Sequence, residues 1–412
     1  MQQVFKYILI AFLLPVLYGT KVYRIHPING LQVRYLRSWI ENAELEINVW
    51  KEPSIPNNPV DIQVKDEFQS RFIDFLDKNN FSYSIMIDDL DLLLQQENIE
   101  SKSFGYSGKF DYYKYNQYSN IRFELSNLER KYKNAKVFHV GNSFENQTIN
   151  GLKITNGDAI SKPAVWIDGG IHAREWISTA TVMFFINRLL TDSGPDVQLA
   201  LSKYDFYLLP VFNPDGYRYT FGGSQQRLWR NTLSINPFAS CKGADPNRNF
   251  AYKWGEKGAS NEPCKESYRG LSAFSEIEVK NVAGFLEKLA KSVTLKSYWN
   301  LHAYSQLFLT PWSYTTTDAS DQDEFVRISK IFTDVVSRRY GTKYRAGSPA
   351  NILYPASGGS IDWTYGYLGV IYSFALELRD NGSYGFVLPA DQIKPTGEET
   401  TDAILAAINA MK

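Results

Sequence analysis

The chain has 412 residues, of which 44% are hydrophobic, 15% aromatic and 21% charged, and this composition excludes a disordered or fibrous protein. Its 44 basic residues equal its 44 acidic residues in number, which argues against a nucleic-acid binder that neutralises phosphates. Two cysteines exclude a multi-disulfide scaffold and a cysteine-rich zinc finger, and four histidines leave little room for a metal cluster built from histidine alone. The length predicts two or three domains.

The first 19 residues resemble a secretory signal peptide. Lys6 precedes an apolar run from Tyr7 to about Leu17, which is too short to span a bilayer. Cleavage after Gly19 would leave a mature chain without another stretch of eighteen apolar residues. We therefore expect a secreted, extracellular protein with no membrane anchor; the alternative is a buried N-terminal helix.

Secretion would expose the chain to an oxidising compartment and to glycosylation. There, Cys241 and Cys264 are expected to form a disulfide that closes a short loop, the alternative being two buried free thiols. Asn80, Asn146 and Asn381 begin glycosylation sequons, although the sequence does not tell whether they are occupied.

Residues 20–109 are predicted to form a separate small unit. They contain 14 acidic and 10 basic residues, whereas 110–412 contain 30 acidic and 33 basic residues, so opposite net charges favour docking of the two parts. Apolar spacing and β-branched runs predict an α+β unit with an antiparallel sheet. The expected helices are 31–40 and 68–76, and the expected strands are 22–25, 46–50, 60–64 and 83–87. A stretch rich in Gly and Ser at 101–109, with Lys102 and Lys109 near its ends, is a predicted linker and protease site.

Residues 110–412 are predicted to form one large α/β domain. Apolar runs that alternate with helical patterns indicate a mostly parallel or mixed sheet covered by helices on both faces. The expected strands are 164–168, 206–211, 294–301 and 370–376, and the expected helices are 176–190, a segment around 325–336, and 393–411.

A candidate metal site follows two of these strands. His172 and Glu175 are three residues apart directly after 164–168, and His302 ends another apolar strand. Two histidines and one glutamate form a typical catalytic zinc set with an open fourth position. The alternative is that both histidines are hydrogen-bonded core residues. His26 and His139 have no acidic neighbours of this kind and are expected in ordinary strands.

Glu377 is a candidate general base, because charged residues are rare in buried strands unless they have a partner or a function. The alternative is an ion pair with Arg379, which lies two residues further along the same strand face. Two further motifs carry Arg227, Arg230 and Arg248 among polar residues. Arginines beside a metal can bind a carboxylate or stabilise an oxyanion, and elsewhere they are usually solvated.

These motifs together resemble those of secreted zinc metallocarboxypeptidases of the pancreatic carboxypeptidase A/B family in proenzyme form. The resemblance covers about 20–412 and rests on ordered motifs at 172–175, 213–217, 227–230, 243–249, 302–306, 356–363, 377–380 and 384–386. It implies a catalytic domain at 110–412 with a mixed eight-stranded sheet covered by helices on both faces. It also implies an activation propeptide domain at 20–109 with a small α+β antiparallel open sandwich.

The resemblance implies a role for each site residue. His172, Glu175 and His302 would bind one zinc ion per chain, Glu377 would be the general base, and Arg230 would stabilise the oxyanion. The remaining residues would bind the peptide substrate: Asn247, Arg248 and Tyr354 its terminal carboxylate, and Arg174, Tyr304 and Phe386 its outer residues. Arg227 is a weaker candidate for a secondary contact to that carboxylate.

The resemblance also implies specificity and regulation. Ile361 would be the floor of the side-chain pocket and Ala375 would enlarge it, so aromatic or aliphatic C-terminal residues are expected to be cleaved. The propeptide would inhibit its own catalytic domain until a trypsin-like protease cuts at Lys102 or Lys109. We expect a monomer that acts on peptides or proteins. The alternatives are a zinc amidohydrolase acting on acyl amino acids and a non-catalytic binding relative.

Overall fold

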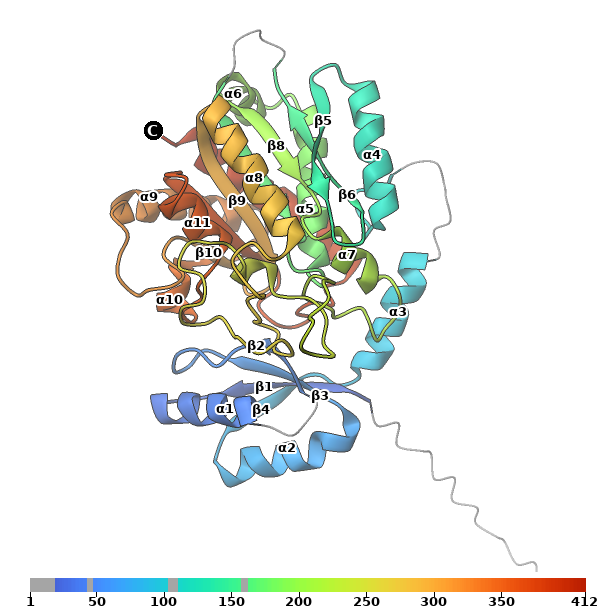
Figure 1. Cartoon of the computed structure of the whole chain (residues 1–412), viewed down its shortest axis with the longest axis vertical. Coiled ribbons are helices and arrows are strands. Elements are labelled where there is room, and N and C mark those ends of the chain that lie inside the picture. The colour runs from blue at the N-terminus through green and yellow to red at the C-terminus, as the bar shows by residue number, and fades with distance from the viewer. Residues whose placement is uncertain (1–18, 43–46, 103–109, 157–161) are drawn as a thin grey trace, which may run out of the picture.

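The computed structural model describes residues 19–42, 47–102, 110–156 and 162–412 (Figure 1). Two separate sheets organise the chain, one of four strands within residues 21–87 and one of eight strands within 135–378. The expected signal peptide, except for its last residue, and Lys109 lie outside the described residues. None of the helices in the described ranges is long and apolar enough to cross a membrane.

The small sheet has the order β2-β3-β1-β4, and all its pairings are antiparallel. Alternate residues of its strands point to opposite faces. Tyr23 and Ile25 pack into a core with helices α1 and α2, whereas Val22 packs toward the larger unit. The bounds of these elements are β1 (Lys21–His26), α1 (Gly30–Asn42), β2 (Ile47–Lys51), β3 (Val60–Val64), α2 (Asp66–Lys78), β4 (Ser82–Ile87) and α3 (Leu90–Lys102). With helices on one face only, this unit is the expected open sandwich (Figure 1).

The large sheet has the order β11-β10-β12-β9-β7-β8-β6-β5. The four central strands β12, β9, β7 and β8 are parallel, and antiparallel pairings of β10 with β12 and of β6 with β8 make the sheet mixed. The strands are β5 (Ala135–Asn142), β6 (Thr148–Ile154), β7 (Ala164–Gly169), β8 (Asp205–Leu209), β9 (Leu295–Ala303), β10 (Leu307–Leu309), β11 (Arg345–Gly347) and β12 (Tyr372–Leu378). The predicted fold class is confirmed.

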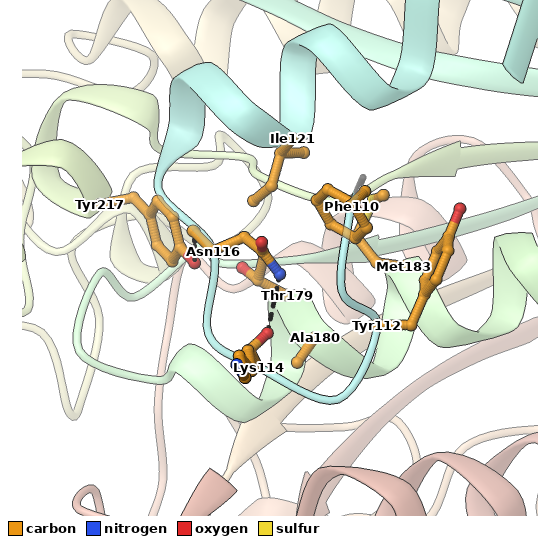
Figure 2. Close-up of a pocket in the computed structure, with 9 residues that line it drawn as sticks. All are labelled: Phe110, Tyr112, Lys114, Asn116, Ile121, Thr179, Ala180, Met183 and Tyr217. Carbon is orange, nitrogen blue, oxygen red and sulfur yellow. Dashed lines mark hydrogen bonds between the residues drawn. The ribbon is translucent and has the colours of Figure 1, made fainter. Parts of the chain in front are cut away.

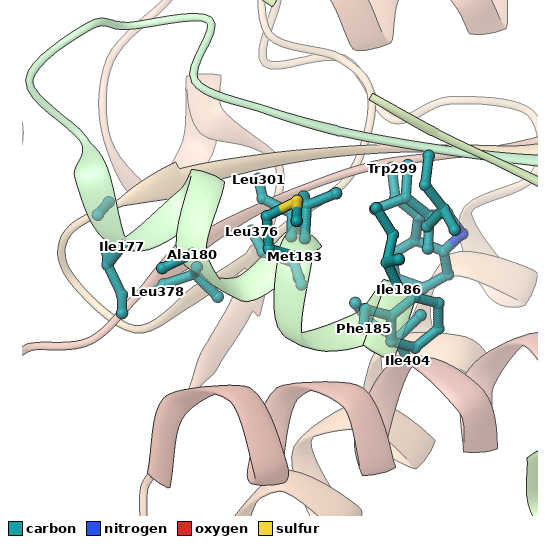
Figure 3. Packing of buried hydrophobic residues seen from close by; sticks show 14 of the residues in the cluster. Ile177, Ala180, Met183, Phe185, Ile186, Trp299, Leu301, Leu376, Leu378 and Ile404 are labelled. Carbon is teal, nitrogen blue, oxygen red and sulfur yellow. The ribbon is translucent and has the colours of Figure 1, made fainter. Parts of the chain in front are cut away.

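Helices cover both faces of this sheet because its central strands are apolar on both sides. In β7, Val165 and Ile167 pack toward α5 and α12, whereas Ala164 and Trp166 pack toward α8. Figure 3 shows the first of these faces, where α5 lies between the strands and Ile404 of α12. The helices of this unit are α4 (Tyr118–Lys131), α5 (Trp176–Thr191), α6 (Pro195–Lys203), α7 (Pro214–Thr220), α8 (Ile277–Ser292), α9 (Gln322–Tyr340), α10 (Pro349–Ile352), α11 (Ser360–Gly366) and α12 (Ile393–Asn409).

Helix α3 was missed by the sequence analysis, and it changes the expected linker. It extends to Lys102, so the predicted linker residues Ser101 and Lys102 belong to the last turn of a helix. Leu90 and Leu94 on α3 are buried in the core cluster of the larger unit and are absent from the core of the small sheet. Cleavage after Lys102 would therefore require this turn to unwind.

The small unit docks on the larger one through the free face of its sheet (Figure 1). Asp61 of β3 accepts a hydrogen bond of 2.6 Å from the Tyr304 hydroxyl and is paired with Arg24 of β1 at 2.7 Å. The Arg24 guanidinium also donates to the Asn381 carbonyl at 3.3 Å. Beside it, a Cβ on Gly382 would lie 1.6 Å from Arg24 Nη2, so this close approach requires a glycine.

Candidate active site and metal centre

The candidate residues meet at the carboxyl ends of the three adjacent strands β7, β9 and β12. Because these strands are parallel, their carboxyl ends lie at one edge of the sheet, where α/β domains usually place their sites. His172 and Glu175 lie in the turn between β7 and α5, and His302 is near the end of β9. Glu377 on β12 is the direct register partner of His302. The structure thus brings these four residues together at one edge of the sheet.

His172, Glu175 and His302 present three ligand atoms to one point. The Nδ1 atoms of the two histidines are 3.1 Å apart, and the Glu175 carboxylate oxygens lie 2.8 Å and 3.1 Å from them. Tetrahedral zinc, with ligand bonds of about 2.0–2.2 Å, separates its ligands by roughly 3.3 Å. All three residues are buried. The donor types and their spacing thus fit one zinc ion with a fourth position left open.

Asp245 supports this centre and was not assigned a role from the sequence. Its Oδ1 lies 3.0 Å from His172 Nε2, and its Oδ2 accepts from Arg230 Nη2 at 2.8 Å. Burial alone would raise the pKa of this carboxyl, but Arg230 and His172 hold the pKa well below its usual range. A permanently ionised Asp245 keeps the proton of His172 on Nε2 and leaves Nδ1 free to bind a metal. The sequence feature that could have identified Asp245 is its position within the motif at 243–249.

Glu377 faces the same space and is not paired with Arg379. Arg379 instead donates to both oxygens of Glu399, at 2.7 Å and 2.6 Å, so the ion-pair alternative for Glu377 is wrong. Burial raises the pKa of Glu377, and the nearby negative charge of Glu175 reinforces this effect. The pKa of Glu175 is shifted in the opposite direction. Burial would raise it, but His172 and His302 lower it below the ordinary value. The two carboxyls thus differ in basicity, as a ligand and a general base should.

A cavity of about 120 Å³, which we call the central cavity, contains nearly all the predicted site residues. Its lining includes the three metal-site residues, Glu377 and seven of the predicted substrate or oxyanion residues: Arg230, Asn247, Arg248, Tyr304, Tyr354, Ile361 and Phe386. Arg230 and Arg248 are mostly buried, not solvated, so the surface alternative for them is wrong. The arrangement brings cationic and hydrogen-bonding groups, the metal-site residues and Glu377 into one cavity.

Ile361 lies on the first turn of α11 and lines the central cavity together with Ala375. Ala375 precedes Glu377 by two residues on β12 and so shares its face. The neighbouring acids point elsewhere. The Asp362 carboxylate accepts from the backbone N–H groups of Ser313 and Tyr314, and that of Asp380 accepts from the backbone of residues 382–385.

The predicted outer residues lie against the small unit. The Phe386 ring contacts Trp50 of β2 and Tyr304, with ring centroids 5.2 Å and 5.1 Å apart. Arg174 stacks on Phe386 at 4.1 Å and donates to both Glu266 oxygens at 3.0 Å, but it does not line the central cavity. Trp50 lines that cavity, as do Lys51 and Glu52 of the same unit. The small unit therefore forms part of the wall of the cavity.

Arg227 is engaged away from the central cavity. It forms an ion pair with Glu97 of α3, donates to the Phe386 carbonyl at 2.8 Å, and stacks on Trp176 at 3.7 Å.

The predicted disulfide is confirmed: Cys241 and Cys264 are bonded, with Cα atoms 5.2 Å apart. The loop that this bond closes contains Asp245, Asn247 and Arg248, so the crosslink restrains the segment that carries them.

Figure 2 shows a second, much smaller pocket where the larger unit begins. It is lined mainly by apolar and aromatic groups such as Phe110, Ile121 and Met183. Asn116 Nδ2 donates to the Lys114 carbonyl at 2.8 Å beside it. None of the predicted site residues lines this pocket.

Comparisons with known proteins agree with this geometry. Residues 121–403 match the family described as zinc carboxypeptidase, and residues 23–97 match the carboxypeptidase activation peptide. The chain is 40% identical to mouse carboxypeptidase A4 over 389 residues, 93% of this chain and 91% of the relative. It is 37% identical to human carboxypeptidase A1 over 395 residues, covering 94% and 92%.

Solved structures give the same result. The crystal structure of thrombin activatable fibrinolysis inhibitor superposes with a TM-score of 0.87 at 31% identity, covering 95% of this chain and 98% of that one. The carboxypeptidase A of Helicoverpa armigera gives a TM-score of 0.84 at 26% identity, covering 96% and 100%.

Proposed function

Because the chain belongs to the zinc carboxypeptidase family and carries a carboxypeptidase activation peptide at 23–97, we propose that His172, Glu175 and His302 bind its zinc ion. The chain is an A-like proenzyme of a C-terminal exopeptidase. The observation that carries the assignment is the convergence of two imidazole nitrogens and a carboxylate beside Glu377. When bound, zinc supplies a Lewis acid and lowers the pKa of a water molecule.

Glu377 and Arg230 have different roles at the scissile bond. Glu377, whose pKa is raised by burial, accepts a proton from the attacking water and delivers it to the leaving amine. Arg230, held by Asp245 at 2.8 Å, stabilises the negative charge that develops on the carbonyl oxygen. Both groups line the central cavity, which supports their action on one substrate.

Asn247, Arg248 and Tyr354 bind the free carboxylate at the end of the substrate. Arg248 is held in place because its Nε donates to the Gly258 carbonyl at 2.8 Å and its Nη1 to the Asn247 carbonyl at 3.0 Å. A guanidinium fixed in this way matches a carboxylate in charge and geometry. Recognition of this group explains why cleavage occurs at the last peptide bond. Arg174, Tyr304 and Phe386 then contact the residues before it.

We expect peptides with an amidated C-terminus to be hydrolysed about 10²–10⁴-fold more slowly, in kcat/KM, than the same peptides with a free carboxylate. Without the carboxylate, the mostly buried Arg248 keeps only the Asp245 carboxylate, 3.9 Å away and shared with Arg230, as an anionic partner. Loss of a partner of a buried charge costs about 3–5 kcal/mol. The measurement compares matched peptide pairs after protease activation, and an acetylated N-terminus serves as the control because it should change little. Equal rates for both C-termini would contradict the proposed carboxylate site and favour a general amidohydrolase.

We further propose that the chain is secreted as a latent monomer and activated by a trypsin-like protease. Secretion is supported by the signal-like sequence at 1–19 and by the disulfide, because disulfides persist in oxidising compartments. Latency is supported by Trp50, Lys51 and Glu52, which line the central cavity from the propeptide side. The division into a signal peptide at 1–19, a propeptide at 20–109 and a catalytic domain at 110–412 remains part of this proposal.

Limited trypsin treatment should convert an inactive chain into an active one. We expect the uncut chain to have only a small fraction of the final kcat/KM, because the propeptide fills the approach to Glu377. Activity and fragment masses followed together should show cleavage before activity appears. Lys102→Ala and Lys109→Ala variants would identify the bond that matters, and the helical position of Lys102 favours Lys109. An uncut chain as active as the trimmed one would overturn the proposal.

A further inference from the structure

A chain of buried polar side chains runs from His302 back into the large sheet. Asn300 lies two residues before His302 on β9, and the two share one face of the strand. Both are almost completely buried, at 0% and 3% exposure. The Oδ1 atom of Asn300 is hydrogen-bonded to His302 Nε2, on the side of the ring opposite the Nδ1 atom that faces His172 and Glu175.

The orientation of the Asn300 amide is fixed by the neighbouring strand. Asp168 of β7 is the register partner of Asn300, and its Oδ1 accepts a hydrogen bond from Asn300 Nδ2. Asp168 Oδ2 accepts from Trp166 Nε1 at 2.7 Å, and Ser360 Oγ donates to Asn300 Oδ1 at 3.2 Å. Because the ionised Asp168 carboxylate only accepts hydrogen bonds, a flipped amide would place two acceptor oxygens against each other. The oxygen of Asn300 must therefore face His302, which must donate from Nε2.

We propose that Asn300, oriented by Asp168, is a positioning residue that holds His302 in the tautomer with its proton on Nε2. The lone pair of Nδ1 is then directed at the zinc ion, as the second partner of a ligating histidine commonly ensures. The inference rests on the proposed role of His302 as a ligand. The two histidines then differ in the partner of Nε2: it is the Asp245 carboxylate for His172 and the neutral amide of Asn300 for His302.

A competing contact of His302 is weaker. Asn247 Nδ2 lies 3.4 Å from His302 Nε2, beyond the usual range of about 2.7–3.2 Å for such a bond. The amide oxygen of Asn247 accepts from Ser360 N at 2.9 Å, which fixes its NH₂ group toward the ring. If Nε2 accepted from Asn247, the proton would sit on Nδ1, between His172 and Glu175. That tautomer could not bind zinc through Nδ1.

Zinc affinity of the full-length chain tests the inference independently of activity. Asn300→Leu keeps the side-chain size but removes the hydrogen bonds to His302, Asp168 and Ser360. We expect the zinc dissociation constant, measured by chelator competition, to rise about 10–100-fold. The cobalt-substituted variant should show a shifted d–d absorption spectrum, which a loss of stability alone would not produce. Thr401→Val is the matched control, because it removes a buried hydroxyl on α12, far from the site, and should leave zinc affinity unchanged.

His302→Ala separates failure of the inference from failure of the ligand assignment. If His302→Ala loses zinc while Asn300→Leu binds it as tightly as the wild type, the inference is overturned and the ligand set stands. If His302→Ala keeps wild-type affinity, both are overturned. Should Asn300→Leu not fold, NMR of the zinc-loaded wild type decides. An exchange-protected Nε2–H of His302 supports the inference, and a rapidly exchanging one overturns it.

Discussion

Replacing Glu377 by glutamine should lower kcat by about 10²–10⁴ while zinc stays bound. Glutamine keeps the size of the side chain but cannot accept a proton, and general base catalysis usually contributes a factor of this size. The wild-type rate should also fall as the pH drops through the pKa of Glu377, which burial raises, because the protonated carboxyl is no longer a base. This acidic limb should disappear from the pH profile of the variant.

The control for this experiment is Glu278→Gln on α8. Glu278 is a completely buried glutamate whose pKa, like that of Glu377, is raised by burial, in this case to about 7. It lies outside the central cavity and accepts a hydrogen bond from Phe144 N. Its replacement should leave kcat unchanged. Loss of zinc from Glu377→Gln would instead identify Glu377 as a metal ligand or a structural group and contradict its proposed role.

Replacing Ile361 by aspartate should redirect the enzyme toward C-terminal Lys and Arg. The wild-type pocket has no anion at Ile361, so a basic side chain would be buried unpaired, at a cost of several kcal/mol. We therefore expect the wild type to release Phe, Tyr, Leu or Met and to cleave basic C-termini slower by several orders of magnitude. Profiling of released residues from a peptide mixture would give both preferences at once.

Ile361→Asn separates charge from size in this test. Asparagine has the shape of aspartate without its charge, so it should weaken cleavage after apolar residues without creating a basic preference. A wild-type preference for basic residues would show that the pocket floor lies elsewhere. Asp362 and Asp380 are poor candidates for such a floor, because their carboxylates are already hydrogen-bonded to backbone N–H groups.

The central strands β7, β8, β9 and β12 of the large sheet and the metal set could be predicted from the sequence because they depend on local patterns. A buried strand followed by His172 and Glu175, and a second strand ending at His302, place ligands at one sheet edge whatever the rest of the chain does. The four β-strands of the propeptide and its helices α1 and α2 likewise follow from apolar periodicity. The family motifs then supplied the substrate-binding residues, nearly all of which line the central cavity.

Contacts between distant segments could not be predicted in this way. Whether Glu377 pairs with Arg379 depends on Glu399, which belongs to α12 and accepts a hydrogen bond from the Arg379 guanidinium. The role of Asn300 depends on its register with Asp168, more than a hundred residues earlier in the chain. Helix α3 was missed, and its buried residues Leu90 and Leu94 pack in a core cluster that consists mainly of residues of the larger unit.

The burial of α3 against the larger unit affects what a cut in the linker can achieve. Leu90 and Leu94 pack in the same core cluster as Tyr118 and Trp176, and Glu97 is paired with Arg227. Cleavage at Lys109 would leave all these contacts intact and remove only the covalent tether. The propeptide would then become an ordinary reversible ligand, and its effective concentration, of millimolar order for a short tether, would be replaced by its concentration in solution. Activity should consequently appear faster in dilute enzyme than in concentrated enzyme, long after the bond itself is cut.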